Sequence, residues 1–232
     1  MKNKEIVYPG QIITDYKEGL ELEGCFIEDN KVISKYYGIV EIQENKIKVV
    51  PLGGVYIPKI GDYVIGEIME VMPNMWLVNI KSPFTATILL KDAFNERIDP
   101  EKTDLSSFYD VGDLVYGKIS NITRNKTVRF SLRDSPKKKL KGGLLIEIHP
   151  NRVPKVIGKK GKTINMIEEK LNVEIIVGRN GLIWIKGENR DNELKAAEII
   201  KLIDKYSHVE NLSDKIKEIL EKDLSTEEIK KL

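Results

Sequence analysis

The chain has 232 residues, of which 41% are hydrophobic and 32% charged, and its formal net charge is +2. This length leaves room for two or three small domains with folded cores. No apolar run reaches the roughly 18 residues of a membrane span, and residues 1–6 lack the apolar core of a signal peptide, so we expect a cytoplasmic protein. The single cysteine, Cys25, excludes a disulfide framework and a multi-cysteine zinc site. With His149 and His208 far apart in the sequence, we expect neither a metal nor a cofactor.

The positive charge is concentrated in one segment. Residues 137–187 carry 12 basic and 4 acidic side chains, net +8, whereas residues 1–60, 61–136 and 188–232 are each net acidic. A basic block in a nearly neutral chain is typical of a protein with a polyanionic partner. A solvated basic face is the alternative.

Residues 1–56 are predicted to form a small β domain. Short apolar runs recur between turn signals, and Glu44-Asn45 separates two alternating runs at hairpin spacing. Prolines and glycines interrupt the chain after residue 50. The segment carries no residues suited to chemistry, so its expected use is docking onto a partner.

Residues 57–136 are predicted to form a second β module. Five short apolar strands, with a long connection between the third and the fourth, fit a five-stranded OB barrel. The pattern resembles the S1-type RNA-binding domain through a Val-Gly-Asp start, an aromatic on the second strand and an arginine on the last. By motif position the resemblance implies RNA contacts for Trp76 and Arg129, while Arg124 and Lys126 precede the last strand and could reach phosphate. Trp76 could equally fill the barrel core.

A lysine-rich stretch, residues 137–143, is predicted to be a basic linker that ends in Gly142-Gly143. Lysines in a linker are often only solvated. Between two candidate RNA modules they could also contact phosphate.

Residues 144–206 follow the order strand, helix, helix, strand, strand, helix. Between the two helices, residues 156–163 read Val-Ile-Gly-Lys-Lys-Gly-Lys-Thr. Glycines allow a nucleic-acid backbone to approach closely, the following helix offers free N–H groups, and lysines add charge. This order and the Ile-Gly-x-x-Gly motif resemble the type I KH domain, whose loop clamps the backbone of single-stranded RNA. The RNA-binding candidates of this domain are Gly158, Lys159, Lys160, Gly161, Lys162, Arg152 and Lys155.

Residues 207–232 are predicted to form a C-terminal helical extension that serves packing or assembly. The expected fold class is therefore multidomain α+β, with a small β domain, an S1-type barrel and a KH domain. Acidic residues are scattered rather than clustered as a two-metal nuclease needs, and no histidine lies near a candidate nucleophile, so no catalytic residue is assigned.

The whole chain resembles the S1-plus-KH cap subunits of the archaeal exosome. Two local signatures support this: Tyr8-Pro9-Gly10, and residues 178–181, Gly-Arg-Asn-Gly, followed by Ile-Trp-Ile. The resemblance implies a non-catalytic subunit, with three copies on a hexameric ring of phosphorolytic ribonuclease subunits. It would bind single-stranded RNA, favour adenine-rich tails and guide the 3′ end into the ring. The alternatives are a stand-alone RNA-binding regulator of translation or transcription, and an assembly protein with a vestigial KH domain.

Overall fold

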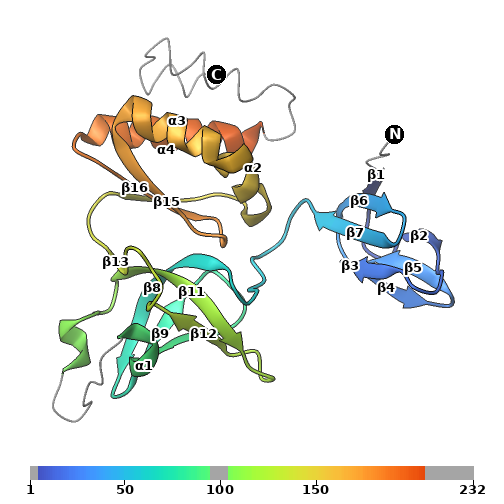
Figure 1. Cartoon of the computed structure of the whole chain (residues 1–232), viewed down its shortest axis with the longest axis horizontal. Helices are drawn as coiled ribbons and strands as arrows, with labels where there is room; N and C mark the ends of the chain where they lie inside the picture. The colour runs from blue at the N-terminus through green and yellow to red at the C-terminus, as the bar shows by residue number, and fades with distance from the viewer. Residues whose placement is uncertain (1–4, 95–103, 207–232) are drawn as a thin grey trace. The chain divides into compact units, whose positions relative to one another are not determined.

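The computed structural model describes residues 5–94 and 104–206 (Figure 1). The chain divides into two compact units, Met1–Gly54 and Val55–Leu232. The C-terminal extension predicted for residues 207–232 lies outside the described residues. Within the described ranges, no helix combines the length and the apolarity that a membrane crossing requires.

The N-terminal unit consists of two small sheets, as the all-β prediction stated. One sheet has the order β1-β6-β7-β3 and the other β2-β5-β4. The predicted hairpin at Glu44-Asn45 joins β6 to β7, and alternate side chains of both strands, such as Val40 and Ile47, are buried. The strands are β1 (Glu5–Val7), β2 (Ile12–Asp15), β3 (Glu21–Glu23), β4 (Cys25–Glu28), β5 (Lys31–Ser34), β6 (Gly38–Gln43) and β7 (Lys46–Pro51).

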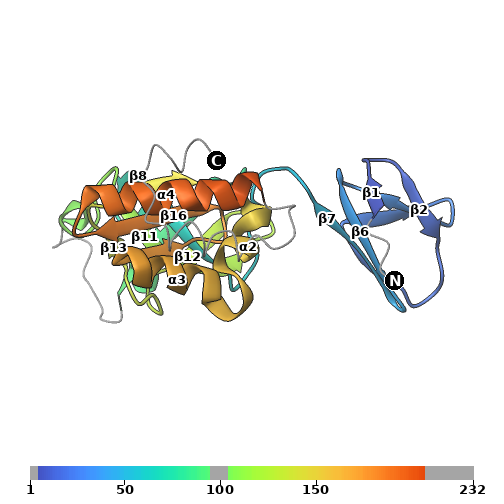
Figure 2. The same ribbon diagram turned by 90° about the horizontal axis from the view of Figure 1, so that it is seen from above.

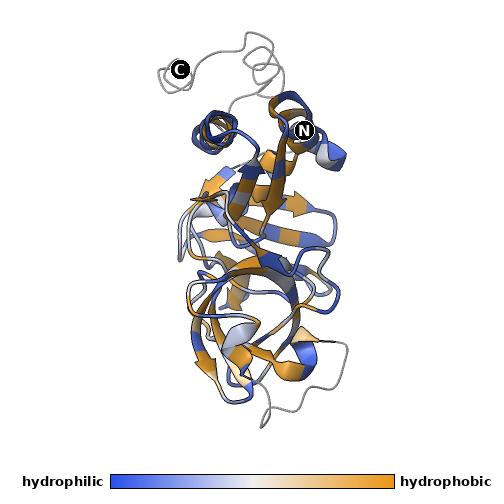
Figure 3. Ribbon diagram, turned by 90° about the vertical axis from the view of Figure 1, so that its left-hand side faces the viewer, coloured by the Kyte–Doolittle hydropathy of each residue, from blue (hydrophilic) through white to orange (hydrophobic). Residues whose placement is uncertain are grey.

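The second unit begins with the predicted five-stranded barrel. Antiparallel neighbours run β10-β9-β8-β11, and β12 closes the barrel by pairing with both β10 and β11. Figure 3 looks into this barrel, whose strands curve around an apolar interior. The long connection carries helix α1 (Leu90–Ala93) and a 3-10 turn at Leu105–Ser107. The strands are β8 (Tyr63–Met72), β9 (Met75–Asn79), β10 (Ala86–Leu89), β11 (Leu114–Ile122) and β12 (Val128–Ser131).

The KH domain has the predicted order of elements. Its antiparallel sheet runs β14-β16-β15, and three helices cover one face (Figure 1 and Figure 2). Apolar side chains of α3 and α4, spaced at helical intervals, form the core with the sheet. This is the type I arrangement that the sequence predicted. The elements are β14 (Leu144–Glu147), α2 (Val153–Ile157), α3 (Lys162–Leu171), β15 (Val173–Val177), β16 (Leu182–Gly187) and α4 (Arg190–Lys205).

The stretch predicted as a basic linker is tied to both modules. Lys139–Leu140 form strand β13, which pairs with β11 of the barrel. The Lys138 ammonium donates to the Ala93 carbonyl at 3.2 Å, and Lys139 forms an ion pair with Asp113. These two lysines hold the chain against the barrel, so partners within the protein occupy their ammonium groups.

The barrel and the KH sheet share an apolar contact. Ile65 and Leu140 pack with Leu182 and Trp184, all of them buried. At the centre of this contact Asn180 is 2% exposed. Its amide nitrogen donates to the carbonyls of Ile65 (2.7 Å) and Ile80 (2.9 Å), and its oxygen accepts from the Ile65 N–H (3.3 Å). The Asn-Gly turn therefore joins the two modules through the barrel backbone.

Candidate nucleic-acid interface

The loop between α2 and α3 has a backbone that depends on its glycines. Gly158 has φ +75°, and a Cβ there would lie 2.3 Å from Thr163 Oγ1. Gly161 has φ +78°, and Lys160 between them also takes a left-handed φ of +54°. Three of four consecutive residues thus occupy the region that side chains disfavour. This conformation turns the chain sharply from one helix into the next.

Lysines and the start of a helix meet at this turn, where the Lys162 N–H donates to the Lys159 carbonyl. Lys159, Lys160 and Lys162 are all exposed, and α3 begins at Lys162 without a side-chain cap at Gly161. The first N–H groups of α3 therefore have no capping side chain, and the helix dipole adds a partial positive charge beside the lysines. The arrangement suits an anionic oxygen.

The two other basic candidates of the KH domain differ in their surroundings. Lys155 is exposed on α2, one turn before the loop. Arg152 is directed to the C-terminal end of α4, where its guanidinium bonds to the backbone carbonyl of Asp204 and, at 3.3 Å, to the Asp204 carboxylate. A cation at a helix C-terminus stabilises that end. The structure thus gives Arg152 a role in packing the domain.

A second basic site lies on the barrel. Arg124 and Lys126 are exposed in the loop between β11 and β12. The Lys126 ammonium lies 5.4 Å from the centre of the Phe84 ring, in the neighbouring loop between β9 and β10. Arg129 follows on β12, between the buried Val128 and Phe130, so strand alternation turns its side chain outward. Basic side chains and an aromatic ring are thus close together.

Family models match both modules. Residues 55–121 match the S1 domain of Rrp4, and residues 143–191 match a KH domain. The chain is 42% identical to the exosome complex component Rrp4 of Pyrococcus horikoshii, over 95% of this chain and 83% of that protein. The chain belongs to the Rrp4 family of exosome components.

Further relatives agree with this assignment to the Rrp4 family. The Rrp4 of Thermococcus kodakarensis is 40% identical over 95% of this chain and 86% of that protein. A solved candidate exosome complex RNA-binding protein superposes with a TM-score of 0.67 at 32% identity, covering 73% of this chain and 97% of the solved one. The relatives are archaeal, as the sequence suggested.

In this Rrp4-family chain Trp76 is part of the barrel core, and its proposed contact with RNA was wrong. The side chain is fully buried, its indole N–H donates to the Tyr109 carbonyl at 2.9 Å, and the Tyr109 and Phe94 rings meet it edge-on. Both the polar and the apolar parts of the indole are satisfied inside the barrel. A base cannot stack on it without the core opening.

The structure adds Phe84, a site residue that sequence reasoning missed. Phe84 lies in the loop between β9 and β10, two residues before β10 begins at Ala86. Nothing in the sequence, however, brings this loop next to Arg124 and Lys126, which lie some forty residues further along. Phe84 is half-buried, so one part of the ring packs on the barrel and another is open.

The N-terminal unit of this Rrp4-family chain exposes apolar side chains as well as charges. Cross-strand neighbours form two rows: on one sheet Ile6 is opposite Ile39, which is opposite Val50, and on the other sheet Phe26 is opposite Ile33, which is opposite Ile12. Ile6 and Ile12 are each about half exposed, at 49% and 51%. Partly exposed apolar rows are a feature of many protein-contact surfaces.

Proposed function

We propose that this chain is a non-catalytic RNA-binding subunit of an exosome. The observation that carries the proposal is the Gly158–Gly161 loop of a KH fold. Its two lysines and Lys162, which follows the loop, are exposed at a helix start without a side-chain cap. The names of the Rrp4 relatives and of the solved RNA-binding protein support the placement in an exosome.

The proposed ligand is single-stranded RNA, held through its backbone. Lys159, Lys160 and Lys162 neutralise phosphates, and the first N–H groups of α3 bond to the same oxygens. On the barrel, Arg124 and Lys126 contact further phosphates while the Phe84 ring stacks on a base. Purines offer a larger face for stacking, which supports the proposed preference for adenine-rich tails.

The proposed partner of the N-terminal unit is a hexameric ring of phosphorolytic ribonuclease subunits, with three copies of this chain on it. The two apolar rows that contain Ile6 and Phe26 supply the contact, because docking would remove their exposed apolar side chains from water. The ring would cut RNA from its 3′ end, and this chain would guide that end inward. A cytoplasmic location is part of the same proposal.

Replacing the two central lysines tests the RNA contact. Lys159→Ala combined with Lys160→Ala removes two phosphate contacts, so the slope of log affinity against log salt should fall by about 1.4 for single-stranded RNA. Affinity should be measured by fluorescence anisotropy at several salt concentrations. Lys170→Ala, at the far end of α3, is the control and should change the slope little.

Mixing the purified chain with the ring subunits tests the assembly. A complex on size-exclusion chromatography that loses RNA binding, but not assembly, with the double lysine variant supports the proposal. No complex, with RNA binding retained, would favour the stand-alone regulator. A complex whose assembly fails in the lysine variant would favour a KH domain that serves as a protein interface.

A further inference from the structure

Strand β15 forms a free edge of the KH sheet next to the lysine loop. The sheet order β14-β16-β15 leaves β15 with one neighbour among the described strands. An edge strand presents unpaired N–H and C=O groups that another molecule can bind. Helix α3, which starts at the loop, packs directly against this strand. The helix that begins at the lysine loop thus connects it to a strand edge with backbone donors and acceptors.

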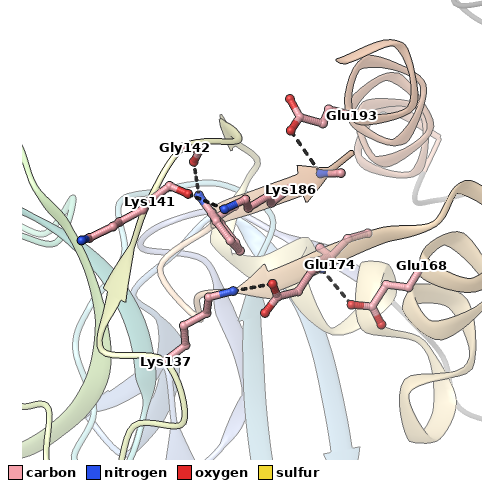
Figure 4. Close-up of polar contacts among 10 residues, drawn as sticks. Lys137, Lys141, Gly142, Glu168, Glu174, Lys186 and Glu193 are labelled. Atoms are coloured by element: carbon pink, nitrogen blue, oxygen red, sulfur yellow. Dashed lines mark hydrogen bonds and ion pairs between the residues drawn. The ribbon is translucent and has the colours of Figure 1, made fainter. Parts of the chain in front are cut away.

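One of those donors is occupied by an acidic side chain. The Ile175 N–H on β15 donates to Glu168 Oε1 of α3 at 2.8 Å (Figure 4). This N–H points away from the ladder with β16, since its partner is the carboxylate. Next to it, Glu174 forms an ion pair with Lys137 from the segment before β13. Carboxylates thus line the edge of β15.

The distances place this edge within reach of RNA held at the loop. Glu168 lies six residues beyond Lys162, which is about 9 Å along the helix axis. A KH loop grips about four nucleotides, which cover about 14 Å even at the stacked spacing of 3.4 Å. A bound strand that runs from the loop along α3 is therefore long enough to reach the Glu168 carboxylate.

We propose that Glu168 is a specificity-determining residue that closes the edge of β15, so that RNA on the loop is held by its backbone and not read by hydrogen bonds at this strand. The inference rests on the proposed function of the Gly158–Gly161 loop. A base that bonds to the Ile175 N–H must first displace a charged acceptor, and its own phosphates meet a negative charge there. The result is tolerance of sequence at the KH loop, and the proposed preference for adenine-rich tails comes from stacking on Phe84 of the barrel.

Three variants separate the effect of covering the Ile175 N–H from the effect of the negative charge on α3. Glu168→Ala opens the Ile175 N–H, Glu168→Gln keeps an oxygen acceptor but removes the charge, and Glu169→Ala removes a neighbouring charge on the exposed face of α3. Binding of the full chain to poly(A), poly(C) and poly(U) should be measured at one salt concentration. Amide exchange at Ile175 reports whether the edge has opened, and thermal unfolding reports whether the fold is kept.

The expected result is a change in discrimination that only Glu168→Ala produces. One newly available hydrogen bond corresponds to about a threefold to tenfold gain for the base that fits it best, with faster exchange at Ile175. Glu168→Gln and Glu169→Ala should raise affinity equally for all three polymers, by the charge effect alone.

Equal effects of Glu168→Ala and Glu169→Ala on all polymers, or faster exchange at Ile175 with unchanged discrimination, would overturn the role of Glu168. The lysine-loop function would still stand if the Lys159 and Lys160 double variant lowers the salt slope. If that double variant also binds RNA normally, the proposed function of the loop fails together with the inference.

Discussion

Two four-residue turns of the KH domain share one sequence pattern, but one is exposed to solvent and the other is buried against the barrel. Gly158-Lys-Lys-Gly161 and Gly178-Arg-Asn-Gly181 both place two residues between glycines. The first turn exposes both of its central lysines, whereas the second buries Asn180 at 2% exposure against the barrel. The residues between the glycines, and the surface against them, decide whether such a turn binds a ligand or joins two modules.

The buried turn supplies hydrogen bonds to backbone groups that lose water when the KH sheet packs on the barrel. Packing the KH sheet on the barrel removes water from the backbone around Ile65 and Ile80, and a single amide side chain replaces it with three hydrogen bonds. The exposed turn does the reverse, because it leaves its donors and charges to water until an anion arrives. One domain thus uses its two turns for rigidity and for binding.

The largest expected effect comes from breaking the buried turn. Asn180→Ala leaves the Ile65 and Ile80 backbone groups without partners in a dry contact, which should lower the free energy of unfolding by about 3 kcal/mol. Urea unfolding followed by tryptophan fluorescence measures this. Arg179→Ala, the exposed neighbour in the same turn, is the control. Equal stability of the two variants would contradict a special role for Asn180.

The sequence predicted the order of elements in both described modules, because alternation and helical spacing are local. It could not place Trp76. Met75-Trp76-Leu77-Val78 puts Trp76 and Val78 on one face of a strand, but only the closed barrel shows that this face points inward. Asn180 was likewise visible as a turn residue, while its partner strand lies about 100 residues earlier.

The candidate site was predicted in part. The lysines of the Gly158–Gly161 loop are exposed as their motif suggested, since a short glycine-rich turn between helices has nowhere to bury them. Arg152 was assigned to the RNA-binding candidates with them, and Lys138 and Lys139 were considered as linker lysines that could contact phosphate. Their partners lie between 26 and 52 residues away, and no local pattern reveals an ion pair or carbonyl contact at that separation.

Replacing a glycine tests the conformation of the exposed Gly158–Gly161 turn. Gly158→Ala combines a left-handed φ with a Cβ 2.3 Å from Thr163 Oγ1, so it should cost roughly 1–3 kcal/mol of stability and displace the lysines that follow. Gly161→Ala shares the positive φ, but its Cβ would lie 3.3 Å from the nearest atom, Asn165 Oδ1. We expect it to be the milder variant. Thermal unfolding and RNA binding of both, measured side by side, give the cost of the Thr163 contact as their difference.

The smallest expected effect concerns the ion pair between Asp113 and Lys139 of β13, the strand that precedes the KH domain. Burial works to raise the pKa of Asp113, but the Lys139 ammonium and the Asp110 N–H outweigh it, so the net pKa is lower than its ordinary value of 3.8. A lowered pKa in the folded state contributes stability above pH 4, and this contribution is lost as the pH falls through the folded pKa.

The expected loss between pH 5 and pH 2 is below about 1 kcal/mol, because the pair is only partly buried. Urea unfolding across that range should show a weaker pH dependence for Asp113→Asn than for the unmodified chain. Asp110→Asn is the comparison, since the Asp110 carboxylate is exposed and accepts from the adjacent Val111 N–H rather than from a lysine among the described residues. If both variants follow the unmodified chain, the Lys139 pair does not hold β13 to the barrel, and Asn180 with its apolar neighbours maintains the contact without it.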